Sequence, residues 1–164
     1  MTRGVSQSLP TTAVLTRAAR PEDISWIEGF IASFTGDGTL LPRPRANLMQ
    51  HVRDFQVAVA QTDLVGCGAL QIVESGLAEI RSIAVDPEWR SRGIGSAILA
   101  ALLDDARDMN LPRVFCLTRR PDFFAMHGFR EVSKEGFPAK IWGDCLICPR
   151  RSACDEIAME RNIS

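Results

Sequence analysis

One segment near the middle of the chain, residues 78–96, has the pattern of a strand, a tight turn and a glycine-bearing loop that leads directly into a helix. Gly93 and Gly95 let backbone N–H groups turn toward an anion without a Cβ in the way. The helix that follows directs the positive end of its dipole at the same place. Arg90 and Arg92 flank the loop and favour the same ligand. The segment therefore predicts a site for a pyrophosphate group.

The arginines and glycines of residues 90–95 follow a strand that ends in an Asp-Pro turn at Asp86 and Pro87. This arrangement resembles the acetyl-coenzyme A signature of the GNAT N-acetyltransferase superfamily, because the strand, turn, leading arginine and helix all lie at the spacing of that family. The alternative is an ordinary strand-to-helix loop whose glycines only ease a tight turn. Residues 123–131 look like the later helix-to-strand element of the family, and the resemblance extends over residues 13 to about 146.

The resemblance implies that acetyl-CoA is the cofactor. In the family, backbone amides near Ile83 and Val85 hold the pantetheine arm like an added strand, and one of them helps to polarise the thioester carbonyl. The expected cofactor-binding residues belong to the strand end, the loop, the helix start and the later motif: Ile83, Ala84, Val85, Arg90, Ser91, Arg92, Gly93, Ile94, Gly95, Ser96 and Phe124.

The composition fits one domain that binds small molecules. A chain of 164 residues can bury about two thirds of its unfolded surface, and we expect a flexible leader at 1–12 and a single acetyltransferase domain at 13–164. The 19 Lys and Arg nearly balance the 20 Asp and Glu, so nothing indicates a nucleic-acid partner or a membrane surface. An odd number of cysteines, no secretory leader and no long apolar run predict a cytoplasmic protein with reduced thiols.

Local patterns predict alternating strands and helices along the chain. Strands are expected at 13–18, 55–60, 64–73, 77–85, 112–117, 129–132 and 140–142, and helices at 21–36, 46–54, 95–109 and 121–127. The resemblance implies an α/β (α+β) fold of the GNAT type. That fold has a mixed, mostly antiparallel central sheet, helices on both faces, and a V-shaped splay between the fourth and fifth strands.

Glu79 is the predicted general base. Acetyl transfer needs a deprotonated amine, and Glu79 lies on the strand that leads to the loop, where many GNAT enzymes similar to this one keep a base. A carboxylate with an ordinary pKa of about 4.3 is a weak base, so partial burial or a bridging water would be required. The alternative is a solvent-facing glutamate paired with Arg81. Strand alternation predicts residues 79, 81, 83 and 85 on one face and 80, 82 and 84 on the other.

The proton donor for the departing thiolate is open. Many superfamily members use a tyrosine near the position of Phe124, but this chain contains no tyrosine. Thr118, Cys116 or water could supply the proton, or the thiolate could leave partly unprotonated.

Residues 40–45, 54–57 and 65–70 look like the N-acetylglutamate synthase branch of the superfamily. In that branch, arginines from the loop between the first two helices and from the C-terminal part hold the carboxylates of the amino acid, in bidentate geometry that favours arginine over lysine. The candidate substrate-binding residues are Arg43, Arg45, Arg81 and Lys140, with Arg150 and Arg151 as further nearby cations. The alternative for each is a solvated basic loop.

The resemblance implies transfer of an acetyl group to the α-amine of a small amino acid, L-glutamate in arginine biosynthesis. The alternatives are a GNAT enzyme that acetylates a protein N-terminus, a lysine or another small amine, and a non-catalytic module that binds coenzyme A. Because 164 residues cannot include the amino-acid-kinase domain of full-length members, we expect a short stand-alone form. Dimers are frequent in similar proteins, so a homodimer is considered.

Cys145, Cys148 and Cys154 raise the question of a zinc site. Structural zinc normally takes four ligands, and no histidine follows these cysteines. The fourth ligand would have to be His127, an aspartate or a distant cysteine. Reduced thiols, a redox pair or pocket lining are the alternatives, and we expect no metal.

Overall fold

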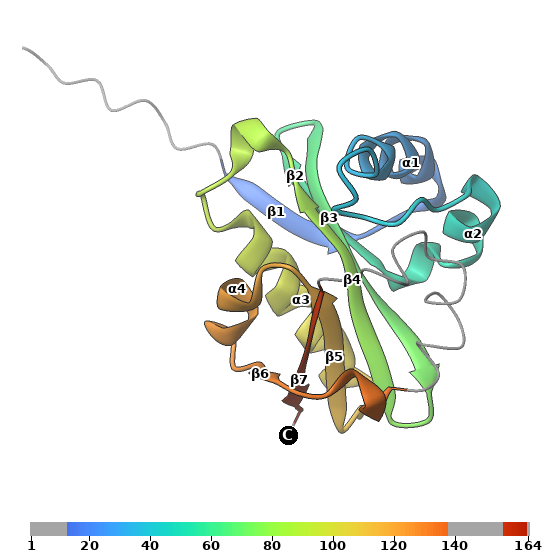
Figure 1. Cartoon of the computed structure of the whole chain (residues 1–164). Coiled ribbons are helices and arrows are strands. Elements are labelled where there is room, and N and C mark those ends of the chain that lie inside the picture. The colour runs from blue at the N-terminus through green and yellow to red at the C-terminus, as the bar shows by residue number, and fades with distance from the viewer. Residues whose placement is uncertain (1–12, 138–155, 164) are drawn as a thin grey trace, which may run out of the picture.

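The computed structural model describes residues 13–137 and 156–163. Their strands form a seven-stranded sheet in the order β1-β2-β3-β4-β5-β7-β6 (Figure 1). The strands are β1 Val14–Ala18, β2 Phe55–Ala60, β3 Asp63–Glu74, β4 Leu77–Val85, β5 Arg113–Thr118, β6 Arg130–Glu131 and β7 Ile157–Asn162. Neighbouring strands are antiparallel except for the parallel pair β4 and β5. The expected mixed, mostly antiparallel sheet is therefore confirmed.

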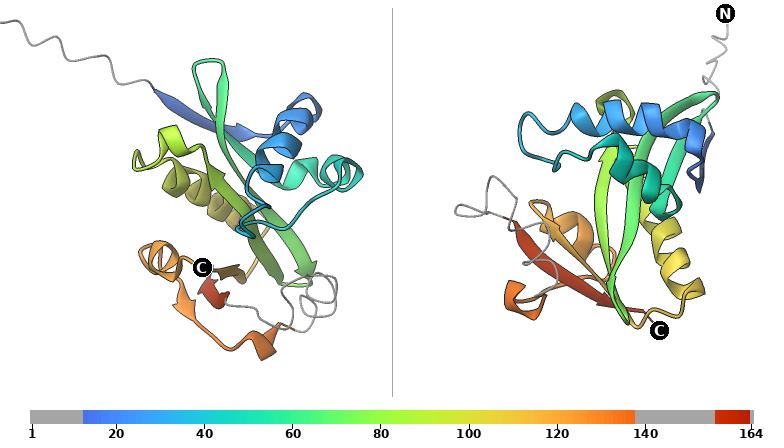
Figure 2. Two further views of the ribbon diagram at one scale, coloured as in Figure 1. Left: turned by 45° about the horizontal axis from the view of Figure 1, so that its top comes forward. Right: turned by 90° about the vertical axis from the view of Figure 1, so that its right-hand side faces the viewer.

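Helices cover both faces of the sheet. They are α1 Ile24–Ala32, α2 Arg45–Gln50, α3 Ile94–Asp108 and α4 Pro121–Ala125, with short 3-10 turns at Pro21–Asp23, Val52–Asp54, Pro87–Trp89 and Lys134–Gly136. Figure 2 shows α1 and α2 on one side of the sheet and α3 on the other. Within the described ranges, the helices are too short or too polar to cross a bilayer.

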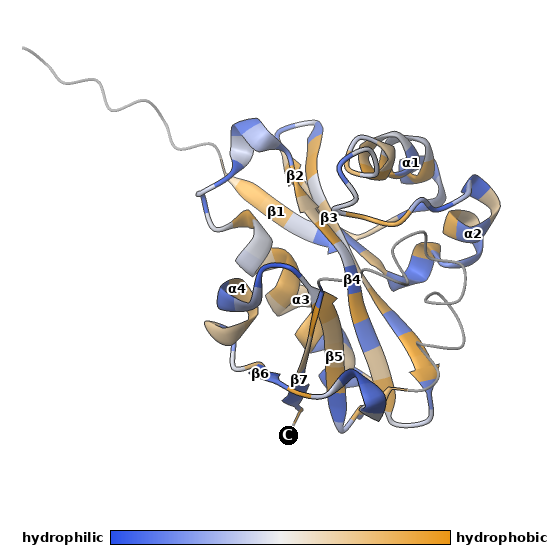
Figure 3. Cartoon of the chain, in the orientation of Figure 1, coloured by the Kyte–Doolittle hydropathy of each residue, from blue (hydrophilic) through white to orange (hydrophobic). Residues whose placement is uncertain are grey.

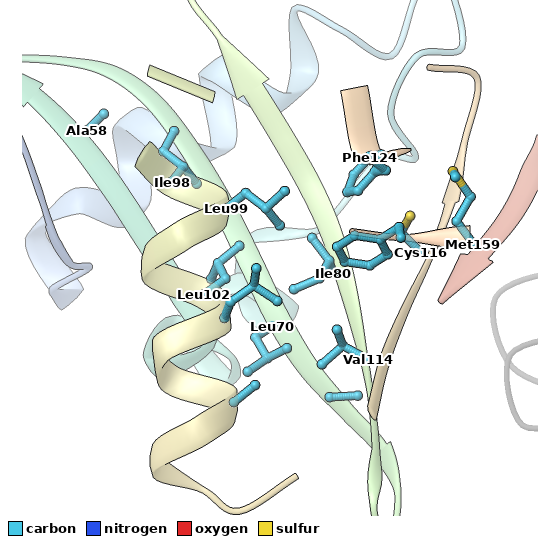
Figure 4. Close-up of a cluster of buried hydrophobic side chains, with 14 of the residues drawn as sticks. Ala58, Leu70, Ile80, Ile98, Leu99, Leu102, Val114, Cys116, Phe124 and Met159 are labelled. Atoms are coloured by element: carbon cyan, nitrogen blue, oxygen red, sulfur yellow. The ribbon is translucent and has the colours of Figure 1, made fainter. Parts of the chain in front are cut away.

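Separate clusters of buried apolar side chains fill the two sides. Ile98, Leu99 and Leu102 of α3 pack on β3, β4 and β5 (Figure 4). Ile24, Ile27 and Ile31 of α1 join Leu48 and Phe55 in the second cluster. β5 lies between covered faces, and Figure 3 shows it in the hydrophobic colour along most of its length. The apolar residues whose helical spacing predicted α1 and α3 therefore form the core.

The alternation predicted for β4 is wrong beyond Arg81. The pairing of β3 with β4 shifts between Ala69↔Arg81 and Cys67↔Ala84, so β4 carries one extra residue. Ser82 has a φ of 57° at this bulge. As a result Ile83 and Val85 pack against the α3 cluster, which also holds Ile80. Glu79 and Arg81 remain on the α1 and α2 face, and the predicted common face of residues 79, 81, 83 and 85 does not exist.

The expected V-shaped splay between the fourth and fifth strands is present. β4 and β5 pair only between Leu77–Glu79 and Arg113–Phe115. Beyond Glu79 the two strands diverge, and both run on toward the end of the sheet where α3 begins (Figure 1).

β7 was not predicted from the sequence. It lies between β5 and β6 and contains Glu160, a charged residue that is 7% exposed. Arg113 and Arg130 donate hydrogen bonds to the Glu160 carboxylate at 3.1 and 2.8 Å. A buried charge paired in this way interrupts the apolar pattern by which strands are predicted. The strand expected at 140–142 and the leader at 1–12 lie outside the described residues.

We predict that Gly68→Ala destabilises the fold. A Cβ at Gly68 would lie 2.7 Å from Cγ2 of Ile98 and 3.0 Å from Cγ1 of Ile83, because α3 packs closely on β3. Overpacking of this kind should lower the free energy of unfolding by about 1–3 kcal/mol, as measured by chemical denaturation.

The matched control is Gly29→Ala, in the middle of α1. A Cβ there meets no atom within 4 Å, so the same substitution should raise the free energy of unfolding by up to about 1 kcal/mol through helix propensity. A Gly68→Ala protein as stable as the wild type would contradict the close packing of α3.

Candidate active site

A pocket of about 630 Å³ lies in the splay of β4 and β5, at the start of α3. Its wall includes β4 from Ile80 to Val85 and the end of β5 at Leu117 and Thr118. The loop before α3, the first turn of α3 and α4 complete it on one side. Phe34, Thr39 and Leu40, which follow α1, contribute from the other side.

The structure gathers most of the predicted cofactor-binding residues around this pocket. The lining residues among them are Ile83, Ala84, Val85, Arg90, Ser91, Gly93, Ile94, Gly95, Ser96 and Phe124. Arg92 is not part of the lining, because its guanidinium lies over the ring of Trp89, 4.6 Å from the ring centre. Trp89 itself does line the pocket.

The loop before α3 has the geometry of an anion cradle. Ser91 and Gly93 both have positive φ, 63° and 77°. A Cβ at Gly93 would meet no atom within 4 Å, so glycine is needed there for its backbone conformation and not for space. Gly93 is the N-cap of α3, whose first-turn N–H groups have no acceptor within the helix. A Cβ at Gly95 would make only an ordinary contact, 3.5 Å from Phe123.

Cationic side chains contribute to the same pocket. The Nε of Arg90 donates to the carbonyl oxygen of Val85 at 3.4 Å, and its guanidinium lies 5.9 Å from the ring centre of Phe34. Arg81, Arg119 and Arg120 also line the pocket. The pocket thus combines oriented backbone amides with guanidinium groups, the two donor types that bind phosphate oxygens.

Glu79 is buried at the closed end of the splay. It is 3% exposed and pairs in register with Phe115, the last β5 residue paired with β4. Its Oε2 lies 3.9 Å from Nη1 of Arg81. The alternative of a solvent-facing glutamate is therefore excluded, although the ion pair with Arg81 is present. Glu79 itself is not among the residues that line the pocket.

Arg43 and Arg45 have different environments although they are neighbours in the sequence. Arg43 is 7% exposed, its guanidinium lies 5.1 Å from the ring centre of Phe55, and its Nε donates to Oδ1 of Asn47 at 3.0 Å. Arg45 is exposed and donates to Oγ of Ser25 at 3.0 Å. Lys140, Arg150 and Arg151 lie outside the described residues.

Arg43 shares a face of the sheet with Arg81. Phe55 pairs with Ala69, and Ala69 pairs with Arg81 in the next strand. Burial raises the pKa of Cys67 on this face to about 12, and the charge of Arg43 opposes that rise. The α1 and α2 side of the sheet therefore carries the cations Arg43 and Arg81 together with Glu79.

The two candidate proton donors differ in access to the pocket. Thr118 lines it, and its Oγ1 accepts a hydrogen bond from the backbone N–H of Arg120 at 2.8 Å, which leaves the hydroxyl proton to donate. Cys116 is 1% exposed and lies in the α3 cluster with Phe124 and Met159 (Figure 4). Burial raises the pKa of Cys116 far above its ordinary value, and the charge of Glu79 adds to the rise.

Within residues 13–137 and 156–163, no group of three or more His, Cys, Asp and Glu side chains is arranged to hold a metal ion. Cys67 and Cys116 are buried free thiols. Cys145, Cys148 and Cys154 lie outside this part of the chain.

Sequence reasoning missed several lining residues. Phe34, Thr39, Leu40, Trp89, Leu117, Arg119, Arg120, Phe123 and Glu156 also line the pocket. Two adjacent arginines, Arg119 and Arg120, directly follow a predicted strand, and this pattern could have indicated that they belong to an anion site. Residues 34–40 gave none, because their approach to the pocket depends on how α1 packs.

The acetyltransferase (GNAT) family matches residues 24–131, which is more than half of the chain. An uncharacterised N-acetyltransferase of Chlorobaculum tepidum is 39% identical over 155 residues, which cover 94% of this chain and 100% of that protein. An amino-acid acetyltransferase of Mycobacterium tuberculosis is 44% identical over 134 residues, which cover 79% of this chain and 76% of that protein. Against an amino-acid acetyltransferase of Neisseria meningitidis the identity is 33%, and the match spans only 32% of that protein.

Solved structures agree with this relationship. N-acetylglutamate synthase from Neisseria gonorrhoeae, complexed with coenzyme A and N-acetyl-glutamate, is 28% identical with a TM-score of 0.80, over 94% of this chain and 36% of that chain. A Mycobacterium tuberculosis protein in complex with coenzyme A is 34% identical with a TM-score of 0.78, over 92% of this chain and 99% of that chain. The chain therefore belongs to the GNAT acetyltransferase family and is an N-acetyltransferase that uses acetyl-CoA.

Proposed function

We propose that this enzyme acetylates the α-amine of a small amino acid, with L-glutamate as the acceptor. The observation that carries the proposal is that two arginines, Arg43 and Arg81, lie on the α1 and α2 face together with the buried Glu79, whose carboxylate is 3.9 Å from Arg81. Two guanidinium groups suit an acceptor with carboxylates, whereas a cationic amine would be repelled. The similarity to an amino-acid acetyltransferase of Mycobacterium tuberculosis and to N-acetylglutamate synthase supports the same acceptor class.

The residues around the pocket fit acetyl-CoA, which supplies an acetyl group activated as a thioester. Gly93, Gly95 and Ser96 at the start of α3 would hold the diphosphate, with Arg90 beside them. The β4 backbone from Ile83 to Val85 would run along the pantetheine arm, because β4 has no β5 pairing there. One N–H of that stretch would polarise the thioester carbonyl.

We propose that Glu79 accepts the proton of the acceptor's ammonium group through a bridging water. A relay suits its position, because Glu79 is buried next to the pocket and is not part of the lining. Arg81 lies within 3.9 Å of the carboxylate and also lines the pocket, so it would orient both the base and the acceptor. Thr118 is the proposed partner of the leaving thiolate, since it faces the pocket and Cys116 does not. Its hydroxyl would donate a hydrogen bond to the sulfur and relay a proton from water, because a threonine hydroxyl is a weaker acid than a thiol.

The acceptor is tested by thiol release from acetyl-CoA with a panel of amines. We expect L-glutamate to give the highest kcat/KM, and an amino acid without a side-chain carboxylate to give a value at least about tenfold lower, since one charge-assisted contact is lost. Faster turnover of a peptide N-terminus, a lysine side chain or a polyamine would contradict the proposal.

The arginine assignment is tested by a matched pair of substitutions. Arg43→Gln should raise the KM for glutamate about tenfold or more and leave the KM for acetyl-CoA within about twofold, because Arg43 lies on the α1 and α2 face, which is the proposed acceptor face. Arg45→Gln removes an exposed guanidinium that bonds to Ser25 and should change neither constant by more than about twofold. Equal losses in the two variants would show that the loop acts by overall charge.

For the base, we expect Glu79→Gln to lower kcat at neutral pH by about 10²-fold or more, while calorimetry shows unchanged coenzyme A affinity. The control is Glu74→Gln, an exposed glutamate at the end of β3. It should have wild-type turnover. A Glu79→Gln enzyme with the wild-type pH–rate profile would rule out the assignment of Glu79.

A further inference from the structure

A serine and a histidine meet at the edge of the phosphate cradle. Ser96, in the first turn of α3, lines the pocket. Its Oγ lies 3.0 Å from Nε2 of His127, which follows α4 and is 31 residues away in the sequence. The proposed chemistry uses neither the contact nor the histidine.

The His127 ring is held by its neighbours. Nη1 of Arg161 on β7 donates to the carbonyl oxygen of His127 at 2.8 Å, which ties its backbone to the sheet. The ring centre of Phe123 lies 5.1 Å from the ring centre of His127, and Phe123 also lines the pocket. Gly128, with a φ of 83°, turns the chain directly after the histidine. These contacts hold the imidazole against the hydroxyl of Ser96.

The position of one proton decides what this contact does. A serine hydroxyl has a single proton to donate and lone pairs to accept. If the hydroxyl donated to an unprotonated Nε2, its oxygen would turn lone pairs toward the phosphate oxygens, which is repulsive. If Nε2–H donates to the hydroxyl oxygen instead, the hydroxyl proton is available to the phosphate. Both the neutral Nε2–H tautomer and the imidazolium meet this requirement.

We propose that His127 is a positioning residue for acetyl-CoA: its Nε2–H donates to Oγ of Ser96 and thereby directs the Ser96 hydroxyl proton at the cofactor's diphosphate. The inference rests on the proposed cradle of residues 93–96. Under this proposal the Ser96–His127 contact serves the diphosphate of the acyl donor, and neither the pantetheine arm nor the amino-acid acceptor depends on it.

The test compares His127→Phe, which keeps an aromatic ring against Phe123 but cannot donate, with His127→Gln, whose side-chain amide can supply an N–H near the position of Nε2. We expect His127→Phe and Ser96→Ala each to raise the KM for acetyl-CoA about tenfold, the effect of losing a hydrogen bond to a charged group. Turnover and the KM for the amino acid should stay within about twofold. His127→Gln should restore most of the affinity for acetyl-CoA.

Two further measurements separate positioning from a general structural role. With S-acetyl-pantetheine, which lacks the diphosphate, wild type and His127→Phe should have equal kcat/KM. The double variant Ser96→Ala/His127→Phe should lose no more than either single variant, because both remove the same contact. Multiplicative losses, a loss that persists with S-acetyl-pantetheine, or an unchanged KM in His127→Phe would each overturn the proposal.

A failure of the Ser96–His127 proposal can be distinguished from a failure of the proposed phosphate cradle. If calorimetry of the wild type with coenzyme A shows no binding, the cradle itself is wrong. If coenzyme A binds and Ser96→Ala binds it equally well, only the role of the serine and histidine fails. Thermal melting of each variant checks the fold, and if His127→Phe does not fold, Ser96→Ala and His127→Gln decide the question.

Discussion

The site depends on a parallel strand pair that stops early. β4 and β5 are partners over Leu77–Glu79 and Arg113–Phe115 only, and they then separate. α3 connects them, so the start of α3 and the carboxyl ends of both strands lie at the same end of the sheet. Had the pairing continued, β5 would fill the space along Ile80–Val85 that the pocket now occupies. The splay thus brings a strand edge, a helix N-terminus and the end of β5 to one ligand site.

Because of the bulge at Ser82, the side chains at 83 and 85 lie on the opposite face of the sheet from those at 79 and 81. Before it, Glu79 and Arg81 belong to the α1 and α2 face, where Arg43 lies over Phe55. After it, Ile83 and Val85 pack toward α3, so the strand is anchored on the side of the phosphate cradle. Without the extra residue, side-chain alternation would turn Ile83 and Val85 toward Glu79 and Arg81. Under the proposed function, the bulge keeps these apolar side chains off the acceptor face.

Elements defined by local pattern were predictable, and those defined by partners were not. The bounds of β4 and the start of α3 follow from turn residues and apolar spacing. The Arg-x-x-Gly-x-Gly segment predicted the phosphate-binding loop before α3. The bulge had no local signal, because a serine with positive φ is set by the β3 register. β7 was missed because Glu160 needs Arg113 and Arg130, both distant in sequence, to be tolerated in a buried strand.

The same limit applies within the site. Arg43 and Arg45 are equivalent in the sequence, and only the packing of one against Phe55 and of the other against Ser25 separates them. His127 stood out only as part of the later family motif and as a conceivable zinc ligand, and its contact with Ser96 arises because the turn after α4 packs against the start of α3. Both cases concern the direction of a polar side chain at a junction of elements. The residue type predicts which contacts such a side chain can make. The tertiary packing of its neighbours decides where the side chain points and therefore which ligand it can contact.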